Sequence, residues 1–521
     1  MMQRRIIGRA LVLVAVAALG VAGTAVPGSA GSNAAGKSAY VVVLKAGDRG
    51  AGVRAIAQAG GTIESINKLG IARVASTNAS FAAALGRTGN VQAVGDDAMW
   101  NLGALEATEA AFPDPATQAG TCAAQYGVAT TVGPDPLSVC QWDMRIIHAS
   151  PSGSYDQNQG DGVTIGIIDT GLDFAHPDLA PNIDVGLSCS FITSSNPNAD
   201  PAEVANGDCS KKSAVQDLAG HGTHVAGEAA GAINGVGIAG VAPEATIVGL
   251  KAGNINGYFF TQEVVDALIY AGDHGIDVVN MSFFADPWLF NCRNDADQRA
   301  IIQAISRAAI YASSHGVVMI AAAGNEGIDL NHPVTDTISP DFPPNSEQAR
   351  DVGNYCVVLP QEIPGVAAVS AIGPKGILSF YSTYGNFVAV TAPGGSSLQA
   401  PNPFGRVLNA WSSTAPPTAG GNETRTVEDC SGGPCVRWAW VQGTSMASPH
   451  AAGVAALILS AHPNLAPGAV IARLGTTAMP MECPEVQDVA PPDFPEKTCT
   501  GGGTHTTFYG SGLVDALAAG A

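Results

Sequence analysis

The chain has 521 residues, of which 46% are hydrophobic and 13% are charged. A chain of this length can bury a large core, and this composition argues against intrinsic disorder. The formal net charge of −20 argues against a protein that binds nucleic acid.

Residues 1–30 have the pattern of a secretory signal peptide. Arg4, Arg5 and Arg9 precede the apolar stretch LVLVAVAALGVAG, and small residues follow up to Ala30. A membrane anchor is the alternative, but the apolar stretch is short for a span and no second stretch of sufficient length follows it. The sequence therefore predicts a secreted, extracellular protein with no membrane segment once the signal is removed.

Residues 38–98 have the pattern of a small separate unit. Strand-like and helix-like segments follow one another there in the order β-α-β-β-α-β, which is typical of a ferredoxin-like fold. Residues 37–99 carry seven Lys/Arg and four Asp/Glu, a net charge of +3, and the signal carries another +3. The part from residue 100 onward therefore carries −26. We expect the basic unit to dock electrostatically on this acidic part.

Residues 100–141 are interpreted as an N-terminal extension of irregular structure. The segments FPDPATQAG and VGPDPLSVC in it are rich in the residues that form turns and loops. The segment is therefore predicted to be less regular, with turns and loops, and to be the region where the chain is processed.

All ten cysteines lie from Cys122 onward. An even number of cysteines in an exported chain predicts disulfides, although spacing alone leaves their connectivity open. Zinc binding is the alternative, and the lack of Cys-x-x-Cys pairs argues against it. Proximity in the sequence favours Cys122–Cys140, Cys189–Cys209, Cys430–Cys435 and Cys483–Cys499, which leaves Cys292–Cys356.

From residue 160 onward, apolar runs typical of buried strands alternate with helical patterns. Because these runs are continuous, they suit a mostly parallel sheet that is covered on both faces. The fold class predicted for residues 142–521 is therefore α/β with a doubly wound sheet. The predicted strands are GVTIGIID, ATIVGLKA, DVVNMSF, VVMIAAAG, VAAVSAIG and FVAVTAPG, and the predicted helices span 261–274, 296–314 and 446–460.

Three polar residues follow these strands or stand at the entrance of a helix. Asp169 ends its predicted strand, and His221 and Ser445 each lie where a Gly-containing turn enters a helix. In doubly wound sheets, ligands bind beyond the carboxyl ends of the strands. A serine hydroxyl becomes a nucleophile when a base is within hydrogen-bond reach and a third group orients that base. The pattern predicts that His221 accepts the proton of Ser445 and that Asp169 holds the imidazole.

A serine at a helix N-terminus can attack a carbonyl while its own backbone N–H faces the developing oxyanion. Asn325, in AAAGNEG directly after another predicted strand, supplies a second donor. Such a side-chain amide stabilises the transition state by about 2.7–4 kcal/mol. Each of these four residues alone has a structural explanation as a cap, a turn or a core residue. Their occurrence together favours catalysis.

The segments IIDTGLDFAHPDL, GHGTHVAG and GTSMASPHAAGVAAL closely resemble the three signature motifs of the subtilisin-like serine proteases. The resemblance covers roughly residues 142–517. It implies a serine endopeptidase with a triad of Asp169, His221 and Ser445, and it implies that Asn325 is the side chain of the oxyanion hole. No cofactor is required for this chemistry.

The resemblance also implies that residues 38–98 are an inhibitory propeptide. Such a unit assists folding, acts as an intramolecular inhibitor and is removed by self-cleavage. The expected cut lies between about Asp97 and Asp143. The expected partners are then a peptide or protein substrate and the chain's own propeptide, with neither nucleic acid nor membrane, and the mature enzyme is expected to be a monomer.

Substrate contacts follow from the same resemblance. NMSFFADP stands in the place of the family's strand that pairs with a bound peptide, which implies that Ser282 and Phe283 bind substrate. Phe284 and Ala285 depart from the glycines that the family often has, so a narrow-specificity processing protease is the alternative to a broadly degradative enzyme. The resemblance further assigns substrate contacts to Gly324, Gly443 and Thr444.

A structural calcium ion is a further implication. Ca²⁺ takes oxygen ligands, some of them backbone carbonyls. AINGVGIAGVAP matches the family's calcium loop in length, and Asp178 and Asn234 fall on ligand positions. The family's N-terminal glutamine ligand has no clear counterpart, because Ser138 falls at its place, and a loop without metal is the alternative. The implied carbonyl ligands are Ala232, Val236 and Ile238.

Insertions and competing functions complete the prediction. Residues 186–214 and 397–440 have the pattern of two insertions, each with a predicted disulfide. A sedolisin-like acid peptidase shares a similar serine motif but uses a glutamate base, and the intact HGTH around His221 argues against it. An inactive binding protein on a protease fold is the alternative from another functional class.

Overall fold

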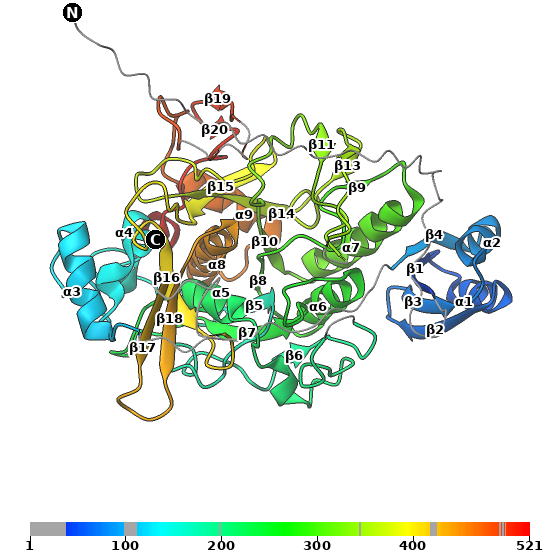
Figure 1. The fold of residues 1–521 in the computed structure, drawn as a ribbon, viewed down its shortest axis with the longest axis horizontal. Helices are drawn as coiled ribbons and strands as arrows, with labels where there is room; N and C mark the ends of the chain where they lie inside the picture. Colours follow the sequence, from blue (N-terminus) through cyan, green and yellow to red (C-terminus); the bar gives the residue numbers. More distant parts are fainter. Residues whose placement is uncertain are drawn as a thin grey trace, which may run out of the picture.

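The structure is a computed structural model that describes residues 38–97, 112–196, 199–342, 345–416, 425–488, 491, 494 and 496–521. The predicted signal peptide at 1–30 lies outside the described residues. Figure 1 shows a small N-terminal unit, in blue, beside a larger domain that holds a central sheet. Within the described part of the chain, no helix is long and apolar enough to cross a membrane.

The N-terminal unit confirms the predicted β-α-β-β-α-β order. Its four strands form an antiparallel sheet in the order β2-β3-β1-β4. Tyr40, Ile56, Val74 and Phe81 belong to a core of its own. The elements are β1 (Ser38–Leu44), α1 (Arg49–Gln58), β2 (Gly61–Ile66), β3 (Ile71–Ser76), α2 (Phe81–Arg87) and β4 (Val91–Asp96).

The other face of this small sheet packs on two helices of the larger domain, α6 (Thr261–Asp273) and α7 (Ala296–Ser314). Because side chains alternate along a strand, Val41 and Val43 face these helices while their neighbours face the unit's own core. The N-terminal unit therefore covers the outer surface of α6 and α7.

The central sheet has seven parallel strands in the order β15-β14-β10-β8-β5-β7-β6. Helices α6 and α7 cover one face, and α5 (His221–Ala230) and α8 (Thr444–Ala461) cover the other. The predicted doubly wound α/β fold is confirmed. The strands are β5 (Thr164–Asp169), β6 (Cys189–Ser190), β7 (Thr246–Lys251), β8 (Val278–Met281), β10 (Val318–Ala322), β14 (Val366–Ile372) and β15 (Val388–Pro393).

The order in which strands are added to the sheet reverses at β5. From β5 the chain proceeds to β7 on one side and then to β8 on the other side. Such a reversal leaves a crevice outside the carboxyl ends of the strands, where ligands bind in this class of sheet. This crevice positions the candidate site described below.

The interpretation of FPDPATQAG as turn and loop is wrong for its second half, which begins the helix α3 (Pro115–Tyr126). The Asp114 side chain accepts the Thr117 N–H at 2.9 Å, Pro115 opens the helix, and Gly127 ends it in the left-handed region. The residues that we interpreted as loop formers therefore mark the two ends of a helix. Helix α3 packs with Trp438 and Trp440 of the larger domain.

The insertion at 397–440 contributes a three-stranded antiparallel sheet of β16 (Val407–Trp411), β18 (Val436–Val441) and β17 (Thr426–Asp429). The remaining elements are α4 (Trp142–Ile146), α9 (Pro467–Thr477) and α10 (Ala516–Ala519), the 3-10 turns Ser138–Cys140, Ser154–Asp156 and Lys212–Val215, and the short strands β9 (Asn291–Cys292), β11 (Thr335–Asp336), β12 (Arg350–Asp351), β13 (Cys356–Val357), β19 (Gly501–Gly502) and β20 (His505–Thr506).

All ten cysteines are paired: four pairs are those that sequence proximity favoured, and the fifth joins the two cysteines that were left over. The disulfides are Cys122–Cys140, Cys189–Cys209, Cys292–Cys356, Cys430–Cys435 and Cys483–Cys499. All of them lie in the part of the chain that follows the N-terminal unit.

Candidate active site

Asp169 and His221 meet at the carboxyl end of the central sheet. Asp169 is the last residue of β5 and is fully buried, and His221 is the first residue of α5. Nδ1 of His221 donates to Oδ1 of Asp169 at 2.7 Å, and the backbone N–H of Thr170 donates to the same oxygen at 2.7 Å. The imidazole is thus held in one orientation, with Nε2 left for another partner.

Asp217 fixes the start of α5. Its Oδ2 accepts the backbone N–H and the hydroxyl of Thr223, and its Oδ1 accepts the N–H of Gly220 and the hydroxyl of Thr170. Gly220 has φ +95°, and a Cβ there would lie 2.5 Å from the Trp411 ring, so glycine is required. Sequence reasoning missed Asp217, although an Asp shortly before a helix is a known capping signal.

The charge around His221 favours the imidazolium. Burial lowers the pKa of His221, but the carboxylates of Asp169 and then Asp217 raise it, and the net result is a pKa above the usual value. The ring remains 30% exposed. A proton that reaches His221 is therefore stabilised at a position open to a ligand.

Ser445 lies in the first turn of α8. Its hydroxyl donates to the backbone carbonyl of Ser282 at 3.1 Å, and the hydroxyl of Ser282 donates in turn to the carbonyl of Ser445 at 2.9 Å. These two contacts fasten the start of α8 to the segment directly after β8. In this structure the Ser445 hydroxyl points at Ser282 rather than at the imidazole.

The Asn325 side chain is oriented by Thr444. Oδ1 of Asn325 accepts the Thr444 N–H at 2.8 Å and the Thr444 hydroxyl at 3.0 Å. The N–H of Gly324 donates to that same hydroxyl at 3.1 Å. Because the amide oxygen is occupied, the NH₂ group of Asn325 remains as a donor. Gly443 and Thr444 thus stand beside the amide of Asn325, and Gly443 also lies next to the backbone nitrogen of Ser445.

His221, Ser282, Asn325 and Ser445 line one cavity of about 660 Å³. This size suits the side chains of a bound peptide. Phe283 is largely buried and stacks on Phe259 with ring centroids 4.1 Å apart, so it forms a wall of the cavity rather than an open edge. The predicted substrate residues Gly324, Phe283 and Thr444 also line this cavity.

Three carboxyl groups that the sequence did not reveal line the same cavity: Asp286, Glu326 and Asp341. Burial raises the pKa of Glu326, and it raises the pKa of Asp341 to about 6. The pKa of Asp286 lies well above its usual range because of burial and the neighbouring Asp341. Glu326 follows Asn325 directly and could have been noticed, whereas folding alone brings residues 286 and 341 together.

The residues predicted to hold calcium also meet. Asp178 is fully buried, and its Oδ2 accepts the indole N–H of Trp438 at 2.7 Å and the N–H of Ile238 at 3.1 Å. Burial raises the pKa of Asp178 to about 8, and the Asn234 side chain contacts this carboxyl group. Asp135, which sequence reasoning missed, accepts the N–H groups of Asn234 and Gly235 at 3.2 and 2.6 Å.

At this place Oδ1 of Asp178 and Oδ2 of Asp135 are both buried without a hydrogen-bond partner among the described residues. Ca²⁺ binds oxygen atoms of carboxylates, amides and backbone carbonyls. This place offers two carboxylates, one side-chain amide and the backbone of a loop. The residues present therefore fit a calcium ion.

The model of the subtilase family (peptidase S8) matches residues 160–512. A thermophilic serine proteinase from Bacillus sp. (strain AK1) is 32% identical over 309 residues, which cover 59% of this chain and 55% of that protein. Subtilisin DY from Bacillus licheniformis is 31% identical over 320 residues, which cover 61% of this chain and 85% of that protein.

Solved structures agree in fold. The epidermin leader peptide processing serine protease from Staphylococcus aureus has a TM-score of 0.63 at 21% identity, over 93% of this chain and 97% of that chain. Fervidolysin from Fervidobacterium pennivorans has a TM-score of 0.58 at 21% identity, over 93% of this chain and 61% of that chain. At these identities the likeness shows the fold.

Proposed function

The chain belongs to the subtilase family, and on that premise we propose that it is a secreted serine endopeptidase. One observation carries the proposal. The hydroxyl of Ser445, the imidazole of His221 that Asp169 holds, and the amide of Asn325 line a single cavity. These are the nucleophile, the base with its orienting group, and the oxyanion donor of acyl transfer.

In the proposed mechanism, the Ser445 hydroxyl turns from the Ser282 carbonyl toward Nε2 of His221 and attacks the scissile carbonyl. His221 takes the hydroxyl proton, and the Asp169 carboxylate stabilises the imidazolium. The NH₂ group of Asn325 and the backbone N–H of Ser445 donate to the oxyanion. His221 then protonates the leaving amine, and water hydrolyses the acyl-enzyme by the same steps.

We propose that residues 38–98 are a propeptide that inhibits the enzyme until it is cut off, and that the mature enzyme is a monomer. The cut is expected upstream of Asp114. Helix α3 begins there. The Cys122–Cys140 disulfide ties it to the turn that directly precedes α4, and it packs with Trp438 and Trp440 of the larger domain. The expected cut therefore lies between about Asp97 and Asp114, a shorter range than the one that ended at Asp143.

A narrow-specificity processing protease is the second candidate. It is favoured by Phe284, whose side chain lines the cavity at a position where the family often has glycine. A similar fold belongs to a leader peptide processing protease. Digestion of a peptide library separates the two: a few cleaved sequences support the processing enzyme, and cleavage at many unrelated sites supports the degradative one.

We propose that a calcium ion, when bound, stabilises the loop at 232–238 and takes no part in the chemistry. Asp178 and Asn234 would hold it, and Asp135 would contribute a carboxylate that the family's glutamine does not provide here. The support is that Oδ1 of Asp178 and Oδ2 of Asp135 are buried without a hydrogen-bond partner in the described residues.

Ser445→Ala tests the proposed function. We expect the variant to remain uncut and to lose peptide hydrolysis by a factor of about 10⁶, because the nucleophile is gone. Ser460→Ala is the matched control. Ser460 lies near the other end of the same helix, and its hydroxyl donates to the backbone carbonyl of Asp161. A Ser445→Ala protein that still cleaves peptides would contradict the serine mechanism, and one that still matures when purified would contradict self-processing.

The pH dependence of peptide hydrolysis gives a second readout. Activity that falls at acid pH through the titration of a histidine would exclude both an inactive binding protein and an acid peptidase. Because the pKa of His221 is raised, activity should fall as the pH drops through a value above 6.5. An activity optimum at about pH 4 would contradict a histidine base.

A further inference from the structure

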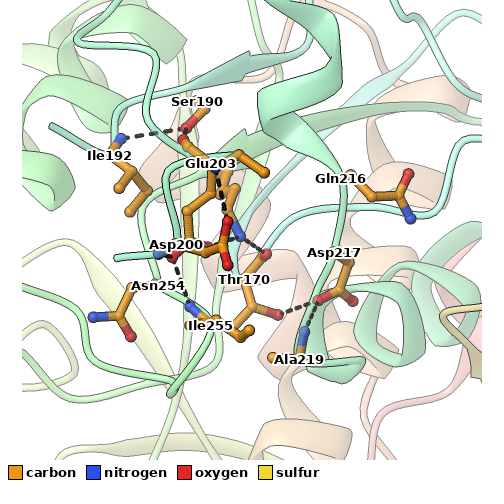
Figure 2. Close-up of polar contacts among 12 residues, drawn as sticks. Thr170, Ser190, Ile192, Asp200, Glu203, Gln216, Asp217, Ala219, Asn254 and Ile255 are labelled. Carbon is orange, nitrogen blue, oxygen red and sulfur yellow. Dashed lines mark hydrogen bonds and ion pairs between the residues drawn. The ribbon is translucent and has the colours of Figure 1, made fainter. Parts of the chain in front are cut away.

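A lysine is buried beside the candidate catalytic aspartate. Lys251 ends β7, pairs in register with Asp169 of β5, and has no exposed surface. Its Nζ lies 3.0 Å from Oε2 of Glu203, which is also buried, and it donates to the backbone carbonyl of Thr170. Figure 2 shows Glu203, Thr170 and Asp217 gathered at this place.

Stability alone is a poor explanation for this ion pair. Taking two charges out of water is costly, and replacing a buried ion pair with apolar residues is often neutral or stabilising. The four residues before Lys251 in β7, residues 247–250, are buried and carry no polar side chain, so the strand could have continued in the same way at residue 251. The position of the charge, at the carboxyl end of the sheet next to Asp169, points instead to the site.

Thr170 is the residue through which Lys251 reaches the site. The Thr170 N–H donates to Oδ1 of Asp169, and the Thr170 hydroxyl donates to Asp217 and accepts the N–H of Gly222 in α5. The Lys251 ammonium holds the carbonyl of the same residue. Every polar group of Thr170 is therefore tied, and Thr170 connects the carboxylate of Asp169 to the helix that carries His221.

Glu203 extends this connection to the wall of the cavity. Its Oε1 accepts the N–H of Asp200 at 2.8 Å and the N–H of Ile255 at 3.1 Å. Ile255 lines the cavity, and Asp200 belongs to the loop closed by Cys189–Cys209. Figure 2 shows Ile255 and Asp200 next to the Glu203 carboxylate. One carboxylate thus joins the inserted loop, the cavity wall and the buried lysine.

We propose that Lys251 and Glu203 are positioning residues for catalysis, and that the inserted loop at 186–214 is part of the catalytic apparatus through them. Lys251 acts through Thr170 on the geometry of Asp169 and His221, and Glu203 neutralises Lys251 while it holds Ile255. The proposal rests on the proposed function, because it assigns a role relative to those two residues.

The test compares the matured double variant Lys251→Met/Glu203→Gln with wild type, with active sites counted by a covalent serine-reactive inhibitor. Removing both charges leaves no unpaired ion, and glutamine still accepts the Ile255 N–H, so thermal unfolding should stay close to wild type. We expect kcat to fall about tenfold or more, because small misplacements of reacting groups are costly, while KM is unchanged.

The pH profile should also change in the double variant. The charged groups that face His221 are Asp169 at the end of β5 and Asp217 before α5, and both raise its pKa. A looser contact with Asp169 therefore moves the acid limb of kcat/KM to lower pH. Lys251→Met/Glu203→Leu also removes the acceptor for Ile255, and it should raise KM in addition. Lys375→Met is the control, because Lys375 is an exposed lysine that follows β14, outside the inserted loop and away from the cavity lining.

A Lys251→Met/Glu203→Gln enzyme with the kcat and the acid limb of wild type would overturn the proposal. So would a double variant that unfolds at a much lower temperature, because the ion pair would then serve stability. Either result leaves the proposed function intact as long as Ser445→Ala is inactive. Activity in Ser445→Ala would refute the function itself.

Discussion

The N-terminal unit and the larger α/β domain are held in place by contacts of different kinds. The unit contains no cysteine, and it lies against α6 and α7 through one face of its sheet and through polar side chains. Arg307 of α7 donates to the carbonyls of Leu44 and Leu69, and Lys68 pairs with Asp273. The larger domain instead has five disulfides.

The most buried polar contact of that interface involves Arg73, which is 2% exposed. It pairs with Asp97 of its own unit and reaches Glu263 of α6 at 3.9 Å and the hydroxyl of Thr193 at 3.3 Å. All these contacts are reversible. The part expected to be removed is therefore attached by contacts that can be given up, whereas the part expected to remain carries covalent cross-links.

Removing the Cys122–Cys140 disulfide should lower the stability of the mature enzyme more than the loss of calcium or of the Arg73 contacts does. Cys122→Ala/Cys140→Ala should cost about 3 kcal/mol of unfolding free energy, because the 18-residue separation constrains the unfolded chain. Cys430→Ala/Cys435→Ala, with a separation of 5, should cost about 2 kcal/mol. Denaturant unfolding measures both. An equal or reversed order would show that loop length does not set these contributions.

Removing calcium should have a somewhat smaller effect, confined to the larger domain. At an ion concentration of 100 times Kd, binding stabilises the folded state by about 2.7 kcal/mol, so a chelator should lower the thermal midpoint. Because the pKa of Asp178 is about 8 without the ion, protons compete with calcium, and binding should strengthen as the pH rises through that value. A chelator should leave Asp178→Asn unchanged. If the thermal midpoint of the wild-type protein changed neither with chelator nor with added calcium, the proposed calcium site would be contradicted.

Replacing Arg73 should have the smallest effect and should act on the docking of the N-terminal unit. In the uncut Ser445→Ala protein, Arg73→Gln should raise the equilibrium constant for opening of the interface about tenfold, because Glu263 and Asp97 lose their cation. Hydrogen exchange of α6 amides measures this opening. Arg87→Gln, at an exposed position of α2, is the control. Unchanged exchange in Arg73→Gln would show that apolar packing alone holds the unit.

Much of the fold could be predicted from the sequence because the signals are local. The apolar runs ending at Asp169 and before Asn325, the β-α-β-β-α-β order of residues 38–98 and the short spacing of most cysteine pairs each reflect neighbours in the chain. Helix α3 was missed because Asp114 and Pro115 at its start were interpreted as loop formers, although they also suit a helix N-terminus.

The sequence alone supports the fold class and the candidate nucleophile with its base and orienting acid. The proximity of cysteines in the chain favours four of the five disulfides, although it does not fix their connectivity. Which charges lie together follows from the folded chain and from no local pattern: Lys251 lies with Glu203, Arg73 with Glu263, and Asp286 with Asp341. These pairs join residues about 50 to 190 positions apart. Their effects depend on burial, because removal from water changes the cost of a charge and the pKa of an acid, and burial exists only once the chain has folded.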